Sequence, residues 1–68
     1  MGMKISLINK ILIELDRGTE AIEEWKFRYN STIQGIEAYN GNKTIIEPQI
    51  LNENFEKVAE RLLEKLGY

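Results

Sequence analysis

Residues 25–47 decide the fold of this chain and read WKFRYNSTIQGIEAYNGNKTIIE. From Trp25 to Tyr29, aromatic and basic side chains alternate, which is typical of a half-buried β-strand. The dipeptides Asn30-Ser31 and Asn40-Gly41 are turn signals, and the second is the strongest short-range signal for a hairpin. We therefore predict a meander of three antiparallel strands, near residues 25–29, 32–39 and 43–47.

The positions of the two turns also predict how the strands pair. If each dipeptide forms a two-residue loop, Ile36 lies opposite Ile45 on one side and opposite Trp25 on the other. This row of apolar side chains is the expected contribution of the sheet to the core.

A helical pattern overlaps the same stretch, with apolar residues at spacings of three and four: Ile22, Trp25, Tyr29, Ile33 and Ile36. Asn, Ser, Thr and Gly are poor residues for a helix interior, and they are frequent between Asn30 and Asn42. The sequence thus favours the sheet. A three-helix bundle, with residues 19–39 as one long helix, is the alternative.

Apolar residues at helical spacing predict a first helix that ends near Arg17-Gly18: Ile5, Ile8, Ile11, Leu12 and Leu15. Leu7 widens their arc to roughly 160°. Ile13 falls among the polar positions, which makes it a candidate contact residue. Gly18 followed by Thr19 reads as a helix stop and a new N-cap, so we expect a short helical turn over residues 19–24.

The last helix has one apolar face, which comprises Phe55, Val58, Ala59, Leu62, Leu63 and Leu66. Asn52 is the expected N-cap, and Gly67 stands where a helix favours a left-handed residue at its C-terminus. Arg61 and Glu64 are expected to pair on the exposed side. The predicted fold class is α+β, with an N-terminal helix, a small antiparallel meander and a C-terminal helix packed on one face of the sheet. Residues 1–68 are expected to form a single small domain.

Composition excludes several kinds of site. The chain has 68 residues with no Cys and no His, which excludes disulfides, zinc fingers, thiol nucleophiles and imidazole bases. A chain of this size is also too small to enclose a typical ligand pocket of about 300 Å³ or more. We therefore expect no enzymatic activity, no cofactor and no metal. Oligomerisation is the remaining way to supplement a small core.

The net charge of −2 gives no support for binding phosphates by charge alone. The sequence has neither a signal peptide nor an apolar run long enough to span a bilayer, so we expect a cytoplasmic protein with no membrane partner. Met1-Gly2 reads as a cloning remnant before a natural start at Met3. The chain has ten Ile, one Val, six Lys and six Asn, a bias that indicates an AT-rich genome or a mobile genetic element.

The strand alternation points the aromatic side chains toward the helices and Lys26 and Arg28 toward solvent. The expected outer side of the sheet is lined by Lys26, Arg28, Ile33, Glu37, Tyr39 and Ile46. Such a mixture of apolar, aromatic and charged side chains is typical of a protein-binding surface. A partner can dock on this side, or an edge strand can pair with a second copy in a twofold homodimer.

The sequence thus predicts a small non-enzymatic interaction module that regulates or inhibits a larger protein by surface binding, encoded by a mobile element. Its predicted partner-binding residues are Ile13, Lys26, Arg28, Ile33, Tyr39 and Ile46. The alternative is a nucleic-acid-binding accessory factor that uses Lys26 and Arg28 with nearby aromatic residues. That alternative predicts an affinity that falls steeply with salt.

Overall fold

The computed structural model of the chain describes residues 2–50 and 52–68. It contains, in chain order, α1 (Gly2–Arg17), β1 (Lys26–Asn30), β2 (Gly35–Asn40), β3 (Lys43–Pro48) and α2 (Phe55–Leu66). The predicted α+β class and element order are confirmed, and the three-helix alternative is wrong. The expectation about a cloning remnant concerns Met1, which lies outside the described residues.

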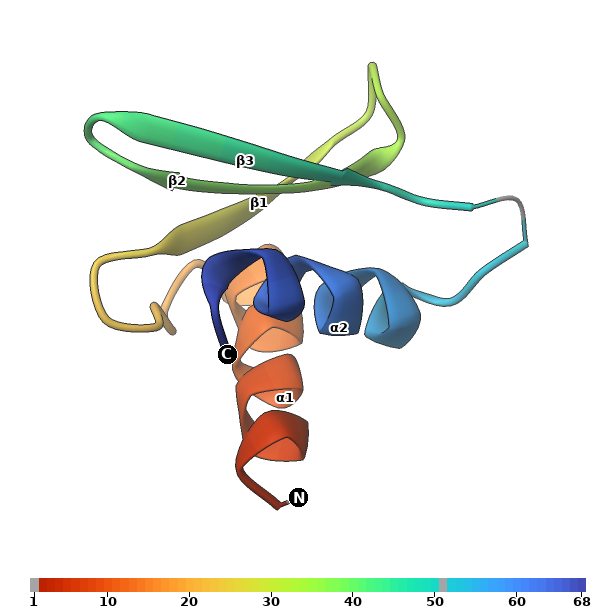
Figure 1. The fold of residues 1–68 in the computed structure, drawn as a ribbon. Helices are drawn as coiled ribbons and strands as arrows, with labels where there is room; N and C mark the ends of the chain where they lie inside the picture. Colours follow the sequence, from red (N-terminus) through yellow and green to blue (C-terminus); the bar gives the residue numbers. More distant parts are fainter. Residues whose placement is uncertain (1, 51) are drawn as a thin grey trace.

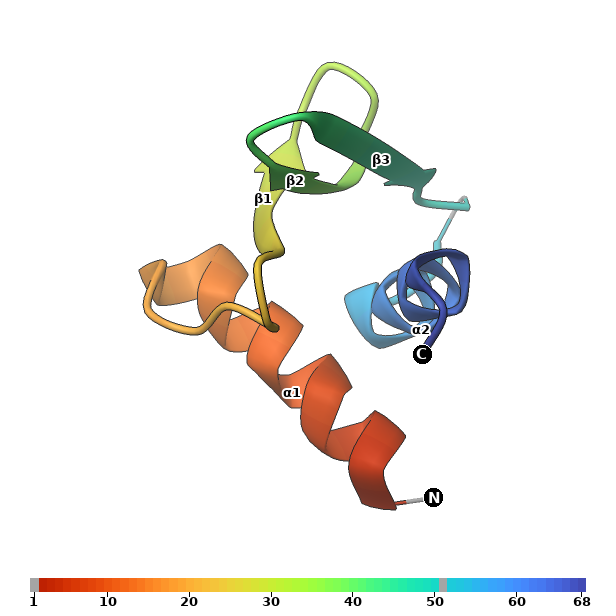
Figure 2. The same cartoon turned by 60° about the vertical axis from the view of Figure 1, so that its left-hand side comes forward.

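The three strands form one antiparallel sheet in the order β1-β2-β3. Both helices lie on the same side of this sheet, so the fold has two layers (Figures 1 and 2). α2 contacts β2, β3 and α1, whereas α1 contacts β1 and α2. The other side of the sheet faces away from both helices. Within the described ranges, no helix combines the length and apolar character that crossing a membrane requires.

The core lies between the two layers and takes side chains from both helices and from the sheet. Its buried members are Ile11, Ile22, Phe27, Ile36, Ala38, Val58, Ala59, Leu62 and Leu63. Phe27, Ile36 and Ala38 are therefore on the helix-facing side of the sheet, as the strand alternation predicts. Tyr29 is also on this side, where its ring packs edge-on against Phe55 at a centroid distance of 5.4 Å.

Both hairpins differ from the predicted register. Ile36 lies opposite Glu47 instead of Ile45, and opposite Tyr29 instead of Trp25. The residue opposite Ile36 is two positions from the predicted one in the β2–β3 hairpin and four positions from it in the β1–β2 hairpin. Because side chains alternate with a period of two, an even shift keeps the residues of the observed strands on their predicted sides of the sheet.

The register differs because both asparagines end their strands instead of occupying the turns. The side-chain Oδ1 of Asn30 accepts hydrogen bonds from the backbone N–H groups of Thr32 and Ile33, at 3.0 and 3.4 Å. In the same way, Asn40 Oδ1 accepts from the N–H groups of Asn42 and Lys43, at 3.4 and 3.2 Å. The first loop therefore occupies residues 31–34, and β2 begins three residues later than predicted.

The segment after α1 is a loop, so the predicted helical turn over residues 19–24 is wrong. The buried carboxylate of Glu14 accepts a hydrogen bond from the Glu20 N–H at 2.7 Å, which fixes the start of the loop. Ile22 and Trp25 then exchange two backbone hydrogen bonds across a tight turn, at 3.0 and 2.8 Å. This turn places Ile22 in the core, which a surface helical turn would not do.

α2 is capped by Asn54 and not by Asn52. Asn54 has extended backbone angles, and its Oδ1 accepts a hydrogen bond from the Lys57 N–H at 3.1 Å. Gly67 closes the helix in the left-handed conformation, with φ of 94°, as the sequence predicts. The N–H groups of Gly67 and Tyr68 donate to the carbonyls of Glu64 and Leu63, which is the hydrogen-bond pattern of a Schellman motif.

Candidate functional site

The candidate site is the side of the sheet that faces away from the helices, which we call the outer face. Its central part consists of two rows of paired residues across the three strands. One row is Lys26, Tyr39 and Thr44, and the other is Arg28, Glu37 and Ile46. These positions alternate with the core residues Phe27 and Ala38 and with Ile45, which packs against the core, so their side chains point to the opposite side.

Arg28 is held at the centre of the outer face by two neighbours. Its Nε donates a hydrogen bond to Glu37 Oε1, and its guanidinium lies over the Tyr39 ring at 4.6 Å from the centroid. Glu37 is only 8% exposed although it is on the outer face. The hydrogen bond to Glu37 and the charge of this carboxylate raise the pKa of Arg28. Arg28 therefore stays charged, and its position is set by contacts inside the sheet.

Ile46 and Tyr39 give the outer face its apolar character. Ile46 lies directly across from Glu37 and is 37% exposed, while Tyr39 is half-buried beneath Arg28. Lys26 is exposed at the edge of the same surface, on β1. The result is an ion pair bordered by an aromatic ring on one side and an aliphatic side chain on the other.

The structure brings together four of the six predicted partner-binding residues, namely Lys26, Arg28, Tyr39 and Ile46. Ile33 is different, because β2 begins at Gly35 and leaves Ile33 half-buried in the loop over residues 31–34. Its predicted place on the strand is therefore wrong. Ile13 is 40% exposed but lies on α1, on the helical side of the sheet, and does not join the outer face.

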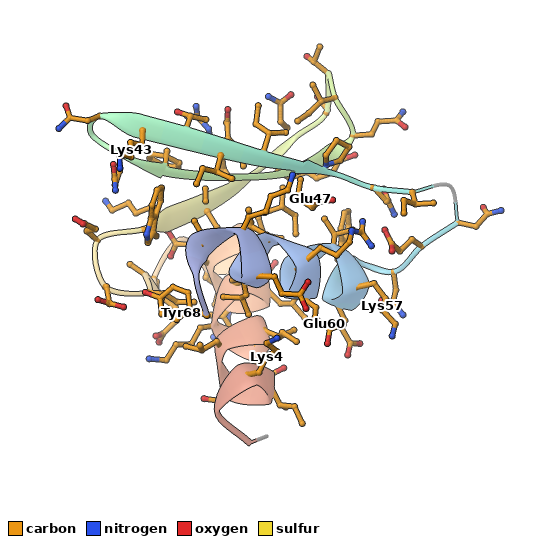
Figure 3. The ribbon with its side chains drawn as sticks, viewed as in Figure 1. Lys4, Lys43, Glu47, Lys57, Glu60 and Tyr68 are labelled. Atoms are coloured by element: carbon orange, nitrogen blue, oxygen red, sulfur yellow. The ribbon has the colours of Figure 1, made fainter. Side chains whose placement is uncertain are left out.

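An ion-pair network that the sequence analysis did not predict joins β3 to α2 on the helix-facing side of the sheet. Glu47 lies on the helix-facing side of β3 and is nearly buried (Figure 3). Its carboxylate contacts Arg61 Nε at 2.9 Å and Lys65 Nζ at 2.8 Å, both from α2. Lys65 also donates to the Ile46 carbonyl at 3.2 Å. The backbone beneath the Ile46 side chain is thus fixed to α2.

Arg61 extends the network to the segment between β3 and α2. It donates to both carboxylate oxygens of Glu53 and to the Pro48 carbonyl, so it does not form the predicted surface pair with Glu64. Hydrogen bonds from Arg61 lower the pKa of Glu53 to about 2 against the opposing effect of desolvation, with help from the Ile50 N–H. For Glu47, burial raises the pKa, but the hydrogen bonds from Lys65 and Arg61 outweigh it and the net shift is downward.

One edge of the sheet, β3, is poorly suited to pairing with another strand. β3 begins with Lys43 and ends with Pro48, which has no backbone N–H. A lysine and a proline on an edge strand both oppose pairing with a further strand. The predicted edge route to a dimer therefore receives no support from β3.

Within residues 2–50 and 52–68, no three acidic side chains are grouped so that they could hold a metal ion. The outer face offers an apolar contact at Ile46 and an arginine, Arg28, whose position is set by Glu37 and Tyr39. These two features suit contact with the surface of another protein. No family model matches this chain, and neither a curated protein nor a solved structure is similar to it at a significant level.

Proposed function

We propose that this chain is a small non-enzymatic interaction module of the cytoplasm, which docks its outer face on a larger protein and thereby regulates or inhibits it. The observation that carries the proposal is the fixed position of Arg28 between Glu37 and Tyr39, next to the exposed Ile46. Tyrosine and arginine are enriched among the residues that dominate binding energy at protein interfaces.

The fixed arginine favours binding because ordering a flexible side chain at an interface costs about 0.5–1.5 kcal/mol. Arg28 is already ordered by contacts within the sheet, so less conformational entropy is lost when a partner docks. The neighbouring Ile46 supplies apolar area at the same place. A partner with an apolar patch and a hydrogen-bond acceptor at its rim fits this arrangement.

The same geometry argues against the nucleic-acid alternative. Binding to single strands combines free cations with exposed aromatic rings on which bases stack. Here the charge of Arg28 is matched by Glu37, and the guanidinium lies over the ring of Tyr39. Phe27 is buried in the core on the other side of the sheet. Lys26 alone gives little positive potential in a chain with a net charge of −2.

Affinity capture from the source lysate with nuclease treatment tests the proposal. The tagged wild-type chain is expected to retain one protein after nuclease treatment. The double variant Tyr39→Ala, Ile46→Glu should lose it, with an affinity at least about tenfold lower when the purified partner is titrated. Arg28→Lys keeps the charge but not the planar fork of the guanidinium, and it should weaken binding as well.

The matched control is Ile50→Glu, which places the same charge on an isoleucine that is 61% exposed in the segment after β3. This variant should capture the partner as the wild type does. If the double variant also retains the partner, the outer face is not the docking surface. If nuclease removes everything that is captured, the protein-interaction proposal is wrong and the nucleic-acid alternative takes its place.

A further inference from the structure

β1 leaves one edge of the sheet without a neighbouring strand. The strand order β1-β2-β3 gives the sheet two edges, and β1 forms one of them. Along a strand, the N–H and C=O groups of successive residues point alternately to one side and the other, so part of the β1 backbone points away from β2. Among the described residues, no backbone group outside β2 forms a hydrogen bond with the backbone of β1.

The edge at β3 is partly occupied by α2, whereas the edge at β1 is not. The carbonyls of Ile46 and Pro48 accept hydrogen bonds from Lys65 Nζ and Arg61 Nη2, both at 3.2 Å. Pro48 also has no N–H to donate. β1 contains no proline, so each of its residues keeps an N–H group. Of the two edges, β1 is therefore the one whose backbone can bind an extended chain.

Two cations of the outer face lie along this edge. Lys26 and Arg28 are two residues apart on β1, and both are exposed. Among the described side chains, no carboxylate forms an ion pair with Lys26. Arg28 donates to Glu37 through Nε, so its two Nη groups remain for a second acceptor. Glu37 is on β2, so a carboxylate on an added strand approaches Arg28 from the opposite side.

These cations distinguish between two possible occupants of the edge. When two copies pair through β1 about a twofold axis, their outer faces are on the same side, and Lys26 and Arg28 of one copy lie beside those of the other. Like charges opposite one another on paired strands are destabilising. A strand with acidic side chains joins opposite charges instead, so the charges favour a segment of another protein.

Tyr29 determines what fits on the helix-facing side of the same edge. It is 44% exposed, and its ring packs against Phe55. The side chains of an added strand alternate in step with those of β1, so every second one lies beside Tyr29. An apolar side chain suits this position, whereas the positions between suit acidic ones.

We propose that the edge of β1 binds an extended segment of the partner, in which acidic and apolar side chains alternate, as an added strand of the sheet. The inference rests on the proposed function, because it names the part of the partner that lies beside the outer face. Backbone hydrogen bonds hold the segment, and Lys26 and Arg28 select its acidic side chains.

An NMR titration of the isotope-labelled chain with short blocked peptides tests this inference. The probe alternates glutamate and valine, and the control peptide alternates lysine and valine. The glutamate peptide should shift the amide signals of β1 more than those of β3, and it should bind at least about tenfold more tightly than the lysine peptide. No binding of the glutamate peptide up to about 1 mM overturns the inference, as do equal affinities or shifts centred on β3.

Methylation of the peptide backbone shows whether the probe binds as a strand. In an added strand, the N–H groups of the glutamates point to one side and those of the valines to the other, so only one set faces β1. Methylation of that set should abolish binding, and methylation of the other set should leave it unchanged. Equal effects of the two methylations contradict an added strand.

A charge reversal on the chain tests the selection of acidic side chains. Lys26→Glu should weaken binding of the glutamate peptide at least about tenfold, because it places like charges opposite one another. Lys43→Glu is the matched control, since it makes the same change at the first residue of the other edge strand, and it should bind as the wild type does. Circular dichroism checks that both variants are folded. If both weaken binding equally, net charge controls the affinity and the inference is wrong.

Affinity capture separates this inference from the proposed function. Loss of the partner from both Lys26→Glu and the double variant Tyr39→Ala, Ile46→Glu supports both. If Lys26→Glu retains the partner and the double variant loses it, the proposed function stands and the inference about β1 is wrong. The reverse result supports the edge and overturns docking on the outer face. Signals of β1 that shift with chain concentration in the absence of peptide would make a second copy the occupant, which also overturns the inference.

Discussion

At Gly35, β2 and β3 approach each other too closely to leave room for a side chain. A Cβ at this position would lie 2.5 Å from the carbonyl oxygen of Glu47 and 2.8 Å from the Cα of Pro48. Both atoms belong to the backbone of the paired strand, so they cannot turn aside as a side chain could. Glycine is therefore required here for steric reasons, because a side chain would push β2 away from β3, the strand that carries Ile46.

We predict that Gly35→Ala lowers the free energy of unfolding by about 1–3 kcal/mol, since an added group in a packed place forces the backbone to move. Urea denaturation measures this change. Gly41→Asn is the control, because Gly41 has φ of 33° with no neighbouring atom within 4 Å and asparagine tolerates this conformation. Gly41→Asn should change the stability by only a few tenths of a kcal/mol. Equal stability of Gly35→Ala and the wild type would contradict the close approach of the two strands.

The individual residues of the outer face were predictable, whereas their contacts were not. Alternation along the strands places Lys26, Arg28 and Tyr39 on one side whatever the register, because both hairpins shift by an even number of residues. The contact between Arg28 and Glu37 depends on the register itself. With a two-residue turn at Asn30-Ser31, Arg28 would lie opposite Ile33, so its pairing with Glu37 could not be predicted.

At the scale of elements, hydrophobic periodicity was enough to predict both helices, whereas the three strands were predicted only with the help of the turn dipeptides and of residues that are poor in a helix interior. The capping role of asparagine was harder to assign, because the same residue type serves turns, strand ends and helix starts. Asn30 and Asn40 end strands, and Asn54 takes the cap expected of Asn52. Whether a given asparagine ends a strand or caps a helix depends on tertiary contacts. Similarly, the pairing of Glu47 with Arg61 and Lys65 follows only once α2 is packed on β3.

The network between β3 and α2 should make the fold sensitive to acid. The pKa of Glu53 is about 2 in the folded chain against 4.5 when unperturbed, and that of Glu47 is also lowered. The unfolded chain therefore binds more protons than the folded chain between these values. The stabilisation is complete above about pH 4.5 and is lost as the pH falls toward 2.

Chemical denaturation at a series of pH values from 5 to 2 checks this expectation. Glu53→Gln keeps the shape of the side chain but does not titrate, so its free energy of unfolding should fall less steeply with acid than that of the wild type. Glu56→Gln, at an exposed position in the first turn of α2, should keep the steep dependence. The same slope in wild type and Glu53→Gln would show that the contact with Arg61 adds no stability.

At the scale of the whole molecule, the sheet of this 68-residue chain has one side packed against both helices and one side that faces away from them (Figure 1). The helix-facing side holds the core, and the outer face is the proposed surface for a protein partner. Domains of this size bury only about 60% of the surface of the unfolded chain. A partner bound to the outer face would therefore add to the stability of a small core.

Native mass spectrometry of the complex captured from the source lysate tests most directly whether the outer face docks on a protein partner. We expect a complex with the partner for the wild type and for the control Ile50→Glu, and the chain without the partner for Tyr39→Ala, Ile46→Glu. Retention of the partner by Tyr39→Ala, Ile46→Glu, or its loss from Ile50→Glu, would contradict this docking surface.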